Sequence, residues 1–130
     1  MANHEPATRP TNAELEILRV LWQRGRSTVR EVHESLRRAD PVGYTTILKL
    51  LQIMSEKGLV TRDESARSHV YAAAASQATT QRRMVSDLVE RVFGGSTLGL
   101  VLQALSTTPA SPRELDEIRK LLDQKKRGKA

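Results

Sequence analysis

Apolar residues recur at helical spacing in three successive segments of residues 1–60, and each recurrence predicts an amphipathic helix. The first stripe consists of Leu15, Leu18, Leu21 and Trp22. Thr11 and Glu14 stand before it at the spacing of a capping box, and Gly25 stands after it. These signals predict a helix that begins beside Thr11 and ends at Gly25.

A second helix is predicted after a short extended piece at residues 26–27. Thr28 and Glu31 repeat the capping-box spacing. The apolar face of this helix consists of Val29, Val32 and Leu36. The segment "RRADPVG" then breaks the helical pattern, because it contains Pro41 and Gly43.

The third helix is predicted within "VGYTTILKLLQIMSEKGLV", residues 42–60. Its core-facing stripe consists of Ile47, Leu50, Leu51 and Met54. Its opposite face carries Thr45, Thr46, Lys49, Gln52 and Ser55. That face has no acidic residue before Glu56, and Lys57 with Gly58 marks the expected end of the helix.

After Gly58 the pattern changes to that of strands. Residues 59–65 and 68–72 can extend and are joined by the polar turn "DESAR", which predicts a two-stranded hairpin. Three helices followed by a hairpin have the order of a winged helix-turn-helix. In such proteins the second helix of the pair enters the major groove, where hydroxyl, amide and ammonium groups can read base edges. The alternative is a solvated face with a threonine used for capping.

Arginines placed around this helix are candidates for phosphate contacts. Arg67 lies at the predicted hairpin tip, Arg62 and Arg26 near the strand bases, and Arg30 in the first turn of the second helix. Each one alone can equally be a solvated surface charge. As a set they would neutralise several phosphates, and DNA affinity would then fall steeply with salt.

The chain beyond residue 75 shows three more amphipathic segments. Gly94–Gly95 separates the first from the second, and Ser111–Pro112 with Glu114 begins the third. Three short helices make a poor core alone, so a second copy of the chain is expected to cover their apolar faces. The predicted homodimer interface consists of Met84, Leu88, Val92, Leu98, Val101, Leu102, Leu105, Leu115, Ile118 and Leu122.

The predicted fold class is therefore mainly α with a small β-hairpin. A winged-helix DNA-binding domain is expected over residues 7–75 and a three-helix dimerisation domain over residues 76–124. Residues 125–130 form a basic C-terminal tail that is expected to be frayed and disordered.

Composition narrows the class of protein further. A net charge of +6 and a pI near 10.2 favour a polyanionic partner, although residues 1–75 hold eleven basic and nine acidic residues. No apolar run is long enough to span a bilayer and no signal pattern opens the chain, so no membrane association is expected. The lack of cysteine excludes disulfides and thiolate metal sites and favours a cytoplasmic location.

Catalysis is not expected from this sequence. His4, His33 and His69 are scattered without metal-ligand spacing and are interpreted as surface histidines. The chain has no cysteine nucleophile, no glycine-rich phosphate loop and no G-x-S-x-G motif. No catalytic residue, metal site or cofactor is predicted, because no nucleophile is paired with a base.

Several segments resemble the penicillinase-repressor family, which includes the methicillin-resistance repressor. They are "AELEILRVLW", "TVREVHESL", "GYTTILKLLQIMSEKGLV", "RSHVYA" and "SPRELDEIRKLLDQ", in the family's order from about Pro10 to Gln124. The resemblance implies a winged-helix repressor that dimerises through its C-terminal helices and binds a two-fold operator. It also implies recognition through Thr46 and Lys49 and a basic wing contact at Arg67.

The resemblance also implies induction by a sensor-linked protease in response to cell-wall or β-lactam stress. Relatives are typically cut at an Asn-Phe bond, whereas Phe93 here has no asparagine before it. Copper-responsive relatives use C-terminal cysteines, which this chain lacks. The inducing signal and the proteolysis are therefore open.

Two positions depart from the family's usual pattern. Relatives usually carry arginine at the position of Ile53 and a basic residue at that of Glu56, and helical phase places both on the outward face. Leu48, often polar in relatives, is a candidate for contact with a thymine methyl, and packing at the helix edge is the equal alternative.

The predicted base-reading residues are Thr45, Thr46, Leu48, Lys49 and Gln52. The predicted backbone and wing contacts are Arg26, Arg30, Tyr44, Arg62 and Arg67. The competing interpretation is a winged-helix protein–protein adaptor without an operator. Ile53 and Glu56 favour the adaptor, whereas Lys49, Arg67 and the basic surplus favour DNA.

Overall fold

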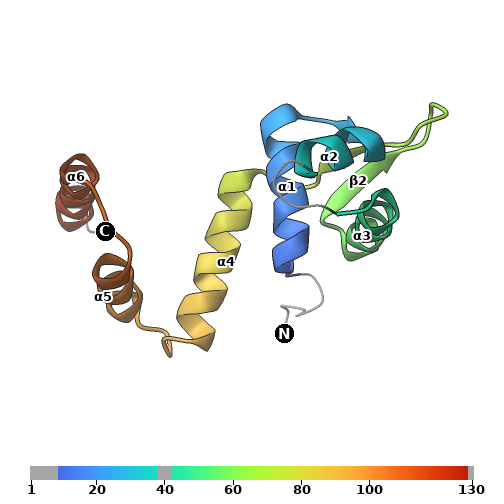
Figure 1. Ribbon diagram of the computed structural model, residues 1–130. Helices are drawn as coiled ribbons and strands as arrows, with labels where there is room; N and C mark the ends of the chain where they lie inside the picture. Colours follow the sequence, from blue (N-terminus) through green and yellow to red (C-terminus); the bar gives the residue numbers. More distant parts are fainter. Residues whose placement is uncertain (1–8, 38–41, 129–130) are drawn as a thin grey trace. The chain divides into compact units, whose positions relative to one another are not determined.

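The computed structural model describes residues 9–37 and 42–128 (Figure 1). The chain falls into two compact units, divided between Met84 and Val85. The break predicted at Pro41 and the histidine at position 4 lie outside the described residues. The division falls inside helix α4 (Gln77–Arg91), later than the boundary expected between residues 75 and 76. The expected domain limits therefore stay a prediction.

The first unit contains helices α1 (Asn12–Arg24), α2 (Val29–Leu36) and α3 (Tyr44–Lys57). The capping box predicted at the start of α1 is present. The Glu14 N–H donates to Thr11 Oγ1 over 3.2 Å, and the Thr11 N–H donates to Glu14 Oε1 over 2.9 Å. Gly25 and Gly58 end α1 and α3 with φ values of 87° and 82°, a region that side chains with a Cβ rarely adopt.

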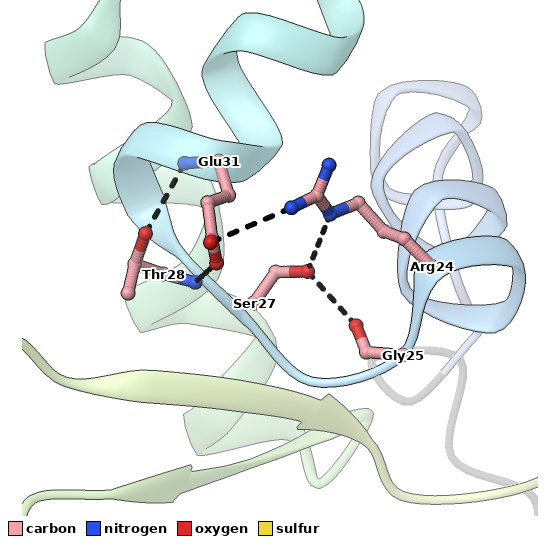
Figure 2. Close-up of polar contacts among 5 residues, drawn as sticks. All are labelled: Arg24, Gly25, Ser27, Thr28 and Glu31. Atoms are coloured by element: carbon pink, nitrogen blue, oxygen red, sulfur yellow. Dashed lines mark hydrogen bonds and ion pairs between the residues drawn. The ribbon is translucent and has the colours of Figure 1, made fainter.

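A network of short contacts fixes the turn from α1 into α2 (Figure 2). Thr28 and Glu31 form the second predicted capping box, with N–H to oxygen distances of 2.9 and 3.2 Å. The Ser27 hydroxyl donates to the Gly25 carbonyl over 2.8 Å and accepts from Arg24 Nε over 3.2 Å. Ser27 is fully buried, and these bonds satisfy its hydroxyl away from water.

The sheet has three strands instead of the two predicted. Strands β2 (Val60–Asp63) and β3 (Val70–Ala73) form the expected hairpin, and β1 (Ser27–Thr28) pairs antiparallel with the other edge of β3. The extended piece predicted at residues 26–27 overlaps β1, but its pairing with β3 was not predicted, because two residues carry no alternation and their partners lie far away in sequence. The loop between β2 and β3, the wing, projects beyond the helices (Figure 1).

The core of the first unit lies between the three helices and the sheet. The predicted stripe on α3 faces it: Ile47, Leu51 and Met54 are buried, and Leu50 packs against them at the edge. The remaining buried apolar residues are Ile17, Leu18, Val20, Leu21, Val29, Val32, Val60 and Tyr71. The core therefore holds α3 by one side only and leaves its opposite side outward.

Two polar contacts add to this packing. Lys57 Nζ and Glu14 Oε1 form an ion pair of 2.7 Å that joins the end of α3 to the first turn of α1. The Trp22 Nε1–H donates to the carbonyl of Ala75 over 3.0 Å. Neither contact was predicted, because each joins residues that are distant in sequence.

Helices α5 (Thr97–Thr107) and α6 (Pro112–Gly128) lie in the second unit, together with the end of α4. The helix start predicted at Ser111 is present, because Ser111 and Glu114 exchange N–H to oxygen bonds of 2.9 and 3.0 Å. The disorder predicted from residue 125 is wrong as far as Gly128, where α6 ends. Residues 125–127 are good helix formers, and their positive charges suit the negative end of the helix dipole.

Candidate nucleic-acid interface

Helix α3 presents the polar face that its sequence predicted. Four of the five predicted base-reading residues are exposed: Thr45, Thr46, Lys49 and Gln52. The N-cap residue is Gly43, and no side chain among residues 9–37 and 42–128 caps this helix start with a hydrogen bond. A threonine does not serve as the N-cap, contrary to the alternative considered for this face. The two threonines lie in the first turn of α3, where the free N–H groups and the helix dipole favour anions.

Leu48 differs from the other four predicted base-reading residues. It is half-buried and packs against the core, which matches the packing alternative considered for it. It also lines a groove of about 380 Å³ between α3 and the wing. Its role at a base edge stays a prediction.

The groove brings predicted site residues together from three elements. Arg30 comes from α2, Tyr44 and Leu48 from α3, and Arg67 from the wing. Two guanidinium groups at one groove suit a phosphate, which guanidinium can bind through paired hydrogen bonds. Sequence reasoning missed three further polar residues that line it, namely Thr28, Ser68 and His69. Only the fold brings these residues beside α3.

Tyr44 occupies the first position of α3 at the rim of this groove. The residue is 48% exposed, and its ring meets that of His33 of α2 edge-on, with ring centroids 6.0 Å apart and an interplanar angle of 80°. This contact fixes the ring on one side. The exposure of the residue leaves it accessible to a partner at the rim.

The other two predicted backbone arginines already have acidic partners. Arg26 Nη2 lies 2.7 Å from Asp63 Oδ2, and Arg62 Nε lies 2.6 Å from Glu64 Oε2. A side-chain hydrogen bond with Tyr71 and the charge of Glu64 raise the pKa of Arg62. Neither arginine is among the described residues that line the groove. The structure thus groups Arg30 and Arg67 with α3, and ties Arg26 and Arg62 to the sheet.

The two family departures lie on the outward side of α3 as helical phase predicted. The Ile53 residue is 43% exposed, and Glu56 is exposed as well. Within the described part of residues 9–84, the exposed large apolar residues are Tyr44 and Ile53. Both stand on α3, so this helix carries the most exposed large apolar residues of the first unit.

The second unit leaves most of its apolar residues exposed. Helices α4, α5 and α6 bury none of their described residues. Eight of the ten predicted interface residues are exposed: Leu88, Val92, Leu98, Val101, Leu102, Leu105, Leu115 and Leu122. Met84 and Ile118 are half-buried. A single chain therefore provides no core for these helices.

The described residues contain no group of three or more histidine, aspartate or glutamate side chains that could hold a metal ion. None of the helices in the described ranges has the length and apolar character of a membrane span.

The family profile described as penicillinase repressor matches residues 10–124. The chain belongs to the penicillinase repressor family. The resemblance seen in the motifs is thereby confirmed, over the same stretch of sequence. Members of the penicillinase repressor family are transcriptional repressors and not enzymes.

Two curated relatives align with nearly the whole chain, and a third aligns with half of it. The penicillinase repressor of Bacillus licheniformis is 24% identical over 119 residues, which cover 92% of this chain and 93% of that protein. The methicillin resistance regulatory protein MecI of Staphylococcus aureus is 20% identical over 88% of this chain and 94% of its own length. The transcriptional regulator BlaI of Mycobacterium tuberculosis is 38% identical, over 50% of this chain and 48% of that protein.

A solved structure supports the fold of the first unit. The solution structure of the DNA-binding domain of the repressor BlaI matches with a TM-score of 0.50 and 23% identity. The match covers 58% of this chain and 92% of that domain. The predicted fold class, mainly α with a winged helix-turn-helix, is confirmed.

Proposed function

We propose that this penicillinase repressor family member is a cytoplasmic, sequence-specific DNA-binding repressor that acts as a homodimer on an inverted-repeat operator. The observation that carries the proposal is the way α3 is packed. Its apolar side is fixed in the core, while Thr45, Thr46, Lys49 and Gln52 face outward beside the groove that holds Arg30 and Arg67.

The side chains of this surface are suited to two kinds of DNA contact, with base edges and with the phosphate backbone. Side chains on α3 can donate hydrogen bonds to base edges in the major groove, where each base pair has its own pattern. Arg30, Tyr44 and Arg67 would bind the backbone and set the register of the helix on the duplex. Leu48 at the groove edge is placed for an apolar contact with a thymine methyl.

The homodimer is supported by the exposed apolar faces of α4, α5 and α6. A second copy would cover these faces and would bring a second α3 to the same duplex. Helix-turn-helix dimers bind half-sites about 10 bp apart or at multiples of that spacing. The operator is therefore expected to be an inverted repeat with such spacing, and a footprint without two-fold symmetry would contradict the dimer.

Release from DNA by a sensor-linked protease is a further part of the proposal. The segment between α4 and α5 holds Phe93 and two glycines with positive φ, Gly94 and Gly95. Because no asparagine precedes Phe93, a protease would need a specificity other than Asn-Phe.

The test is fluorescence anisotropy with a labelled duplex taken from the DNA upstream of the protein's own gene. The proposal expects tighter binding to this duplex than to a scrambled duplex of equal composition. Arg67→Ala should weaken binding and reduce the salt slope by about 0.9, whereas Arg19→Ala, which removes an exposed arginine of α1, should not. Equal, weak binding to both duplexes at every salt concentration would refute the repressor and favour the adaptor.

A further inference from the structure

Arg26 and Asp63 connect the two outer strands of the sheet across the central one. Thr28 of β1 and Asp63 of β2 both pair with Val70 of β3, from opposite sides. Neighbouring strands lie about 4.8 Å apart, so the two outer strands are separated by roughly 10 Å. The long side chain of Arg26, just before β1, crosses this gap and places its Nη2 2.7 Å from Asp63 Oδ2.

Asp63 also holds the first residues of the wing. Its second carboxylate oxygen, Oδ1, accepts the N–H of Ser65 over 2.9 Å. Hydrogen bonds from Ser65, and then from Arg26, lower the pKa of the Asp63 carboxyl below its ordinary value. One carboxylate thus joins the segment before β1, the end of β2 and the start of the loop that carries Arg67.

The pair lies on the solvent side of the sheet. Side chains alternate along an extended segment, so Arg26 and its neighbour Ser27 point to opposite faces. Ser27 is fully buried, whereas the Arg26 side chain is 62% exposed. Arg26 therefore has a carboxylate partner on the outer face, while Arg30 and Arg67 meet at the groove beside α3.

We propose that Arg26 and Asp63 are positioning residues for DNA binding: the pair holds the wing so that Arg67 stays beside the groove. Arg26 then contacts Asp63 in the complex as well, and not a phosphate. The proposal assigns Arg26 a different role from the backbone contact expected from its sequence position. The part of this proposal that concerns DNA binding rests on the proposed function, whereas the part that concerns the position of the wing in the free protein does not.

The test uses the full-length chain with Asp63→Asn, Arg26→Gln and the double variant. Asparagine keeps an oxygen that can accept the Ser65 N–H, so Asp63→Asn removes the ion pair and leaves the turn. Matched controls are Arg19→Gln and Glu16→Gln, which break an ion pair of 3.0 Å on α1 whose side chains are 59% and 56% exposed, respectively. Each protein is measured for binding to the upstream duplex over a KCl series, and for amide exchange in the wing without DNA.

The positioning role predicts that each single variant weakens binding by about fivefold or less, the ceiling for an exposed ion pair. The double variant should be no weaker than either single variant, and the salt slope should stay unchanged. Weaker DNA binding is an informative result for Asp63→Asn, because removing a negative charge near DNA would otherwise tighten binding. In the free protein, the Ser65 amide should exchange faster in each variant than in the controls, because loss of the ion pair lets the wing open more often even where the Ser65 N–H keeps an acceptor.

The opposite pattern would overturn the proposal. If Arg26 contacts a phosphate, Arg26→Gln should reduce the salt slope by about 0.9, and Asp63→Asn should tighten binding. Unchanged wing exchange in both single variants would also overturn it. Should the wild-type chain fail to prefer the upstream duplex, the proposed function fails, and the exchange measurement still decides whether the pair holds the wing.

Discussion

Replacing Lys57 by methionine tests how strongly the end of α3 is held by a buried charge. Lys57 Nζ lies 2.7 Å from Glu14 Oε1, and the two side chains are 17% and 3% exposed. Lys57 also donates to the carbonyl of Arg9 over 3.1 Å. In Lys57→Met the Glu14 carboxylate would stay buried, with the Thr11 N–H as its remaining donor among these contacts.

The expected loss follows from this geometry. Breaking a fully buried ion pair by removing one partner costs about 3 to 5 kcal/mol, and partial exposure of Lys57 lowers this to about 2 to 3 kcal/mol. Glu14→Gln should cost less, about 1 kcal/mol, because the amide oxygen can still cap α1 and the lysine can reach water. The double variant should be more stable than Lys57→Met alone, because it no longer buries an unpaired charge.

Urea unfolding followed by tryptophan fluorescence is the suitable assay. Trp22 is the single tryptophan and lies in the first unit, where its indole N–H bonds to the Ala75 carbonyl, so the signal reports this unit. Lys49→Met is the matched control, since it makes the same replacement on the exposed side of α3 and should be close to neutral. A loss below about 1 kcal/mol for Lys57→Met, or additive losses in the double variant, would refute the argument.

Three further outcomes are expected. If Lys49 reads a base, Lys49→Ala should weaken operator binding by about 1 to 3 kcal/mol and relax specificity. If it binds a phosphate, binding to all sequences should weaken evenly, and an unchanged anisotropy isotherm would show that Lys49 is not part of the site. Leu102→Asp or Ile118→Asp should give monomers and abolish operator binding while Trp22 fluorescence stays native, and an unperturbed dimer in sedimentation would contradict this. The Asp63 carboxyl should titrate in NMR with a pKa below its ordinary value of 3.8. The stability from its contacts with Ser65 and Arg26 is then present above pH 3.8 and is lost as the pH falls through the lowered pKa, and an ordinary pKa would contradict these contacts.

Helix boundaries could be predicted because their causes are local. Thr11, Thr28 and Ser111 each cap a helix through a residue three positions later, and Gly25 and Gly58 end helices through their own backbone conformation. The outward face of α3 was predictable for a similar reason. Once one side of a helix is apolar, helical geometry alone determines which residues oppose it.

The contacts that shape the site could not be predicted, because they join residues distant in sequence. Arg26 and Asp63 were read as a phosphate-binding arginine and a turn residue, and the pair becomes visible only when β1 and β2 flank β3. The same holds for Glu14, which the sequence marks as a capping residue and which also binds Lys57. Ser68 and His69 likewise gain a place at the groove only through the fold.

The two units differ in what can stabilise them, and this difference bears on regulation. The first unit encloses a core from Ile17 to Tyr71, whereas α4, α5 and α6 bury none of their described residues. Isolated helices of such lengths are marginal in water, so in the proposed dimer association and folding of the second unit would be one event. Operator affinity would then depend on protein concentration through dimerisation, and a cut between α4 and α5 would leave a folded winged unit without its partner. Such a unit would keep its base contacts but lose the gain in affinity that comes from linking two half-site contacts.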